Sequence, residues 1–155
     1  MLMVNANIFD VPSDALLLTI DGAKAGMEGN IARQFARRWP EDWTDMVRSL
    51  RYPIPLGRTV ALPWEGDAPW KLFLFASTLH HLDVLEDAEK AAVATRAFLE
   101  GLKLCIKHGA KSLSTPVLQG GWRLSQQQAL DAMWGPAARS VVEHSGLKVS
   151  MCCMP

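Results

Sequence analysis

The stretch Asp14-Ala15-Leu16-Leu17-Leu18-Thr19-Ile20-Asp21 is followed by a glycine-containing loop that ends at Asn30. Ala15 to Thr19 is apolar on both faces, which is typical of a strand covered by helices on both sides of a sheet. A helix is predicted from about Asn30 to Trp39, with Ile31 and Phe35 on its buried side. A strand, a glycine loop and a helix in this order predict an α/β fold.

Outward from this stretch the same alternation continues along the chain. Short apolar strands are predicted at residues 2–6, 15–19, 58–62, 71–76, 112–118 and 147–153. Between them, helices are predicted at 30–39, 41–50 and 87–108, after Ser125 in a Ser-x-x-Gln capping box, and from Pro136 onward. This pattern predicts a mixed, mostly parallel sheet of about six strands between helical layers, within one domain spanning residues 1–155.

Composition excludes several classes of protein. The 155 residues include 16 Lys and Arg against 16 Asp and Glu. A neutral chain is not expected to bind nucleic acid or an anionic membrane broadly, because both need a positive surface. No signal peptide and no apolar stretch long enough to span a bilayer is present, so a cytoplasmic protein is expected. Cys105, Cys152 and Cys153 are expected to be free thiols, and neither a metal nor a cofactor is predicted.

Two loops lead from a predicted strand into a predicted helix through glycine. Glycine lets backbone N–H groups approach a ligand, and a helix N-terminus adds unpaired donors and about half a positive charge. Both loops should lie at the carboxyl edge of the sheet, so together they can hold a diphosphate. The candidate binding residues of the two loops are Gly26, Gly29, Asn30, Ile31, Gln119, Gly120, Gly121, Trp122 and Arg123.

Four segments share an order and spacing with a known pattern. They are Ala6-Asn7-Ile8-Phe9, Asp14 to Asp21, Gly26-Met27-Glu28-Gly29-Asn30-Ile31-Ala32 and Pro116 to Arg123. Together they resemble the macrodomain family, whose pattern begins Gly-Asp-Ile-Thr and continues through a Val-Asp-Ala-Ile-Val-Asn strand to a glycine-rich loop. The resemblance implies a three-layer α/β/α fold and a small-molecule nucleotide ligand such as ADP-ribose.

The chain departs from that pattern at functional positions. Asn7 stands where the family places the aspartate that reads the adenine amino group, so the resemblance puts a base near Asn7. Asp21 stands where hydrolytic members have an asparagine that positions water. An ionised carboxylate only accepts hydrogen bonds, so Asp21 is a candidate catalytic base but not a donor.

Three functions remain open from the sequence. The first is a module that binds ADP-ribose or a related nucleotide. The second is a hydrolase of ADP-ribosyl or phosphate esters that uses Asp21. The third is a ligand-free interaction domain that forms homo-oligomers through Trp64 and Trp70, two rings in a turn that alternatively cover a sheet edge. His80 and His81 follow a predicted strand and are expected to be loop histidines rather than metal ligands.

Overall fold

A six-stranded sheet forms the centre of the computed structural model, which describes residues 1–25, 29–81, 83–120 and 123–153. The strands lie in the order β1-β6-β5-β2-β4-β3. The strands are β1 (Leu2–Val4), β2 (Ala15–Asp21), β3 (Thr59–Pro63), β4 (Leu72–Leu79), β5 (Ser112–Pro116) and β6 (Lys148–Cys152). The helices are η1 (Ile8–Asp10), α1 (Asn30–Arg38), α2 (Pro40–Ser49), α3 (Asp87–Lys107), α4 (Gln126–Met133) and α5 (Pro136–Ser145).

Neighbouring strands are parallel throughout the sheet except at one edge. β3 pairs antiparallel with β4, whereas β1 with β6, β6 with β5, β5 with β2 and β2 with β4 are parallel. Parallel strands must be joined by crossover connections. Here α1 and α2 lie in the connections on one face of the sheet, and α3, α4 and α5 lie in those on the other face. The predicted mixed, mostly parallel sheet of six strands is confirmed.

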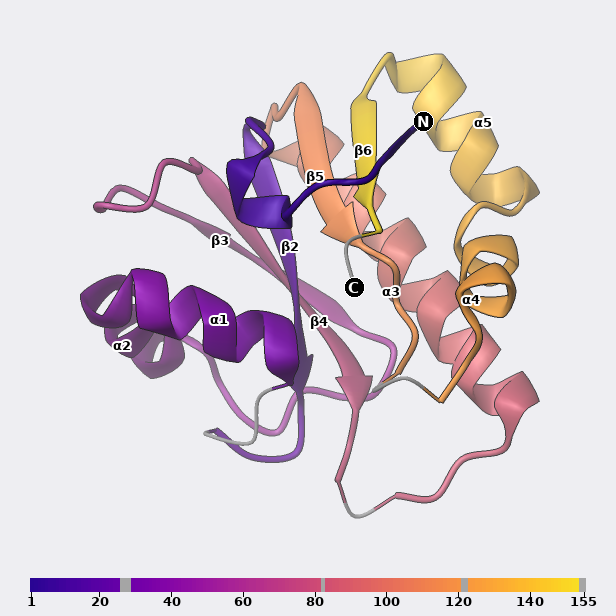
Figure 1. Cartoon of the computed structure of the whole chain (residues 1–155), viewed down its shortest axis with the longest axis horizontal. Helices are drawn as coiled ribbons and strands as arrows, with labels where there is room; N and C mark the ends of the chain where they lie inside the picture. Colours follow the sequence, from indigo (N-terminus) through magenta and orange to yellow (C-terminus); the bar gives the residue numbers. More distant parts are fainter. Residues whose placement is uncertain (26–28, 82, 121–122, 154–155) are drawn as a thin grey trace.

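Helices cover the sheet on both sides, which gives the predicted three layers (Figure 1). Leu17 of β2 packs with Phe98 of α3 in one buried cluster, together with residues of α4 and α5. Leu16 and Leu18 point the other way and pack with Phe35 of α1 in a second cluster. Successive side chains of β2 therefore point into the two cores in turn, as predicted from a strand that is apolar on both faces.

The second core is rich in aromatic rings. Phe35 contacts Trp39, Trp70 and Phe73, with ring centroids 5.0, 6.4 and 5.3 Å apart. Trp70 is only 3% exposed. The predicted self-association surface of Trp64 and Trp70 is therefore wrong for Trp70, because this ring lies in the core under α1. Trp64 is half-buried, and its Nε1–H donates to Asp42 Oδ2 at 3.2 Å.

Most predicted elements are present within a few residues of their expected bounds. The Ser125 capping box forms, with Gln128 N–H donating to Ser125 Oγ and Ser125 N–H donating to Gln128 Oε1. The short helix η1 was not predicted, since three residues carry too little periodicity. No helix in the described part of the chain has the length and apolar character needed to cross a membrane.

Candidate functional site

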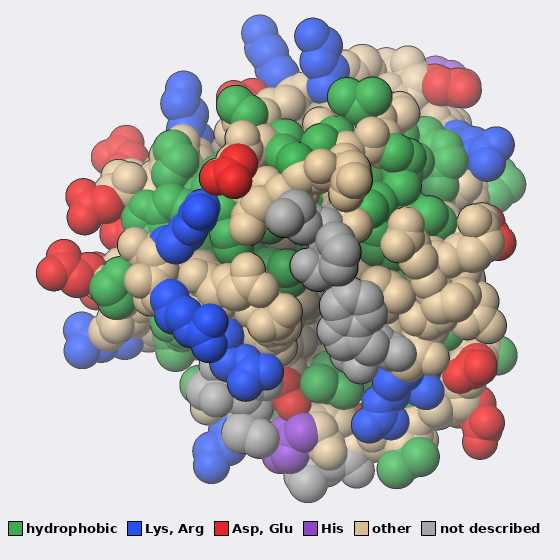
Figure 2. Space-filling view, viewed as in Figure 1, with side chains coloured by type: hydrophobic (Ala, Val, Ile, Leu, Met, Phe, Trp, Pro, Cys, Tyr) green, Lys and Arg blue, Asp and Glu red, His purple; other side chains and the backbone are tan. Residues whose placement is uncertain are grey.

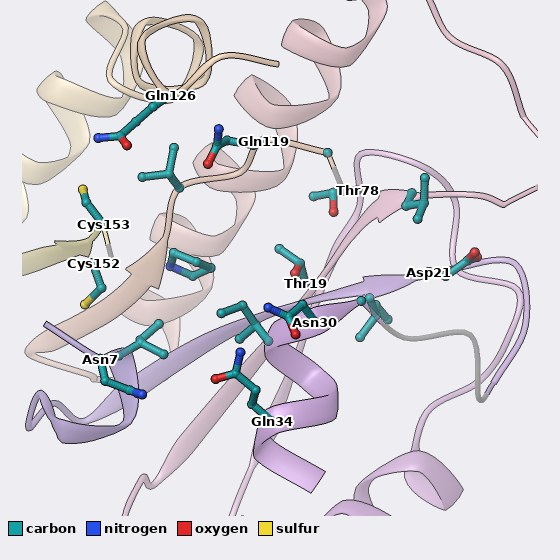
Figure 3. A pocket seen from close by; sticks show the side chains of 18 of the residues that line it. Asn7, Thr19, Asp21, Asn30, Gln34, Thr78, Gln119, Gln126, Cys152 and Cys153 are labelled. Atoms are coloured by element: carbon teal, nitrogen blue, oxygen red, sulfur yellow. The ribbon is translucent and has the colours of Figure 1, made fainter. Parts of the chain in front are cut away.

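A cavity of about 280 Å³ opens at the carboxyl ends of β2, β4 and β5. Its walls come from the end of β2, the start of α1, the loop that follows β5, and the residues after β1 and β6 (Figure 3). Ligands of open α/β sheets bind at this edge because the strand-to-helix loops converge there. Of the predicted binding residues, those in the cavity wall are Asn7, Gly29, Asn30, Ile31, Gln119 and Gly120.

The N-terminus of α1 is open toward this cavity. Its N-cap, Gly29, has no side chain to cap the helix, and Asn30 and Ile31 line the cavity. The first N–H groups of a helix have no partner within it. They therefore present several donors and the positive end of the helix dipole to whatever occupies the cavity.

The loop after β5 turns back on itself around Gln119. Gln119 O accepts hydrogen bonds from Arg123 N–H and Leu124 N–H, and Gln119 Nε2 donates to Leu124 O at 3.1 Å. Gly120 has φ +60°, in the left-handed region that glycine adopts without strain. This turn brings the backbone at Gly120 to the cavity wall. In Figure 3 the neighbouring Gln119 lies across the cavity from Asn30 of α1.

Uncharged amides dominate the polar part of the wall. Among the described lining residues there is no Lys or Arg, and the carboxamide side chains are those of Asn7, Asn30, Gln34, Gln119 and Gln126. Arg123 is exposed and is not part of the wall, so its predicted contact with a ligand gains no geometric support. Figure 2 shows basic side chains gathered over α1, where Arg33 and Arg37 are exposed. Among the described residues, the groups that can bind an anion in this cavity are therefore mainly N–H donors.

Asp21 is held by its own chain. Its side chain is 1% exposed. Oδ1 accepts Ala23 N–H at 2.9 Å, and Oδ2 lies 2.9 Å from His81 N–H and 3.0 Å from His81 Nδ1. In Figure 3 the carboxylate points away from the carboxamides. This geometry favours a loop-anchoring role over activation of water.

Sequence reasoning missed the pairing of Asp21 with His81. The two residues are 60 positions apart, and only the adjacency of β2 and β4 brings them together. The neighbouring His80 turns elsewhere, with Nε2 2.9 Å from Ile54 O. Gly22 packs so closely that a Cβ there would collide with Ser77 and Ile54. His81 thus fastens the end of β2 to the end of β4, whereas His80 holds the segment between α2 and β3.

The last two cysteines of the chain lie beside the cavity on opposite sides of the sheet. Cys152 belongs to the core under α1, whereas Cys153 packs against the core under α3. Burial, with a smaller contribution from Cys153, raises the pKa of Cys152 to about 11, and burial raises the pKa of Cys153. Both thiols are therefore protonated near neutral pH. No metal-binding group of three His, Cys, Asp or Glu side chains occurs within the described residues.

Three predicted binding residues, Gly26, Gly121 and Trp122, lie outside the described residues.

The fold matches that of known macrodomains. The macrodomain of Thermus aquaticus DarG is similar over 99% of this chain and 97% of its own, with a TM-score of 0.73 at 17% identity. The Oceanobacillus iheyensis macrodomain with ADP covers 99% of this chain and 82% of its own, with a TM-score of 0.78 at 10% identity. A Trypanosoma brucei macrodomain in complex with ADP-ribose covers 99% and 63%, with a TM-score of 0.72 at 14% identity.

No protein-family model and no curated protein matches the sequence. At these low identities, the structural similarity establishes the fold: the chain has the macrodomain fold, as its sequence resemblance predicts.

Proposed function

We propose that this protein binds ADP-ribose or a closely related nucleoside diphosphate in the cavity at the carboxyl edge of the sheet. The observation that carries the proposal is the uncapped N-terminus of α1, which opens into a cavity whose other wall is the backbone at Gly120. The N–H donors of a helix N-terminus on one side of a cleft and a glycine backbone that a ligand can approach on the other suit a diphosphate, which offers acceptor oxygens on both sides.

The uncharged wall supports a ligand that is anionic only at its centre. Carboxamides offer both donors and acceptors, which suits the ribose hydroxyls and base edges on either side of a diphosphate. Two structures of the same fold, from Oceanobacillus iheyensis and Trypanosoma brucei, are described with ADP and with ADP-ribose respectively. These two structures support a nucleoside diphosphate as the class of ligand, and the open N-terminus of α1 in this chain is the reason to test its binding.

Calorimetric titration with ADP-ribose tests the proposal, and two neighbouring glutamines offer a matched pair of variants. Gln126 lines the cavity, whereas Gln127 bonds to Asp131 on the outer side of α4. Gln126→Glu adds a negative charge to the cavity and should weaken binding roughly tenfold, while Gln127→Glu adds the same charge to the same helical turn outside it. A titration without heat, or equal losses in the two variants, would contradict the proposal.

The two alternative functions have less support. A hydrolase that depends on Asp21 would need a carboxylate with an oxygen free to hold water, and both oxygens of Asp21 accept hydrogen bonds from the chain. A ligand-free oligomerisation domain would need an exposed tryptophan surface, and Trp70 is buried.

A further inference from the structure

Asn7 forms one end of the cavity, away from Asp21 and Thr78 in Figure 3. It precedes η1 and caps it, because its Oδ1 accepts Phe9 N–H at 3.0 Å. The side-chain nitrogen of Asn7 points toward the middle of the cavity in Figure 3. Among the described residues, no acceptor is found for this Nδ2 group.

The orientation of this amide is set by its surroundings. If it were flipped, its NH₂ group would face Phe9 N–H, so two donors would meet and the cap would be lost. This end of the cavity therefore presents a fixed hydrogen-bond donor. An aspartate at the same position would cap η1 equally well but would present only acceptors.

The same end of the cavity has apolar walls. Ile8 is 4% exposed and Cys152 is 6% exposed, and both line the cavity. Burial holds the pKa of Cys152 at about 11, so its thiol is neutral near pH 7. Gln34, opposite Asn7, carries both a donor and an acceptor on one amide. An apolar slot with one fixed donor and one adaptable amide suits a flat heterocycle with a carbonyl oxygen.

We propose that the Asn7 end of the cavity selects a 6-oxopurine, such as hypoxanthine, over adenine. This inference rests on the proposed nucleotide-binding function and specifies its base. The oxygen at position 6 of hypoxanthine accepts a hydrogen bond from Asn7 Nδ2, and Gln34 can accept from the N1–H group. The amino group of adenine at the same position would bring two donors together and leave Asn7 Nδ2 unpaired, which binding sites discriminate against strongly.

Inosine diphosphate and adenosine diphosphate are the probes that test this, because they differ only at this edge of the base. Calorimetry on the whole chain should give a Kd for inosine diphosphate that is lower by roughly tenfold or more. In Asn7→Asp the preference should reverse, since a carboxylate accepts from the adenine amino group. In Asn7→Ser, which keeps an N-cap acceptor but loses the amide, the two Kd values should approach each other.

The outcomes separate this inference from the function on which it rests. If adenosine diphosphate binds as tightly as inosine diphosphate, or more tightly, the base assignment is overturned while nucleotide binding stands. If the Asn7 variants keep their melting temperatures but do not change the ratio of the two Kd values, the assignment is also overturned. If neither nucleotide nor ADP-ribose binds, the proposed function itself fails.

Discussion

Replacing Gly29 with aspartate should stabilise the protein and weaken its ligand binding at the same time. Gly29 is the N-cap of α1, with φ −75° and ψ −175°, and no side chain caps the helix there. Its backbone conformation is one that any residue adopts, and a Cβ at this position would meet no atom of the described residues within 4 Å. An aspartate can therefore occupy the site without strain and accept the free N–H groups of α1.

The gain in stability has three sources. The new cap contributes a few tenths of a kcal/mol, and loss of glycine freedom in the unfolded chain contributes about 0.4–1 kcal/mol. The charge at the helix N-terminus adds about 0.3–1 kcal/mol. Together these contributions amount to about 1–2.5 kcal/mol, and each 1 kcal/mol corresponds to a rise of about 2–4 °C in melting temperature for a chain of this size.

The loss in binding comes from the same charge. A carboxylate about 4 Å from a phosphate would cost up to about 4 kcal/mol near a protein surface, and solvent and salt reduce this. We expect the Kd for ADP-ribose to rise roughly tenfold to a hundredfold. Gly29→Asn is the control, because it supplies the cap without the charge and should stabilise the protein with a smaller loss of affinity.

Thermal unfolding and calorimetry on the three proteins measure both effects. If Gly29→Asp bound ADP-ribose as tightly as the unmodified protein, the phosphates could not lie at the N-terminus of α1, and this placement would be refuted. Equal losses of affinity in the aspartate and asparagine variants would show that bulk rather than charge matters, and would also contradict it.

Further predictions concern stability and protonation. Asp42→Ala should lower the free energy of unfolding by about 2–4 kcal/mol, because three N–H donors of the turn between β3 and β4 lose their acceptor. The control is Asp45→Ala, at an exposed position of the same helix, which should change the free energy of unfolding by less than about 0.5 kcal/mol. Asp21→Ala should cost about 1–3 kcal/mol, and an unchanged urea midpoint would show that its hydrogen bonds do not hold the loop. Burial raises the pKa of the Cys105 thiol from 9.0 to about 12. Above pH 9 the thiol is therefore deprotonated in the unfolded chain but still protonated in the folded protein. The free energy of unfolding should fall by about 1.4 kcal/mol per pH unit until pH 12. Cys105→Ala should lack this part of the slope in urea titrations between pH 9 and 11, and parallel slopes in the two proteins would contradict the assigned burial.

The fold was predictable because local signals agree with the tertiary structure. The run from Ala15 to Thr19 is apolar on both faces, so it needs helices packed against both faces of the sheet, and its side chains lie in both cores. The glycine before Pro136 and the capping box at Ser125 fixed helix ends through interactions within a few residues. Such short-range signals are readable without knowing what lies across the sheet.

Contacts distant in sequence account for what was missed. A turn between two strands was expected to offer little core for a large ring, yet Trp70 fills the core beside Phe35. His81 gave no local sign of its bond to Asp21, which depends on the register of β2 against β4. The orientation of the Asn7 amide depends on the helix η1, which the sequence pattern did not predict. Arg123 was assigned from its place in the chain; it is exposed and lies outside the described cavity wall, and its contact with a ligand stays a prediction.

The most direct test of the account is a crystal structure of the protein with ADP-ribose. The diphosphate is expected between the N–H groups at Asn30 and Ile31 and the backbone at Gly120, with the base at the Asn7 end of the cavity. Density for the ligand at any other surface, or an empty cavity at millimolar ligand, would contradict the central claim that this cleft is a nucleotide site.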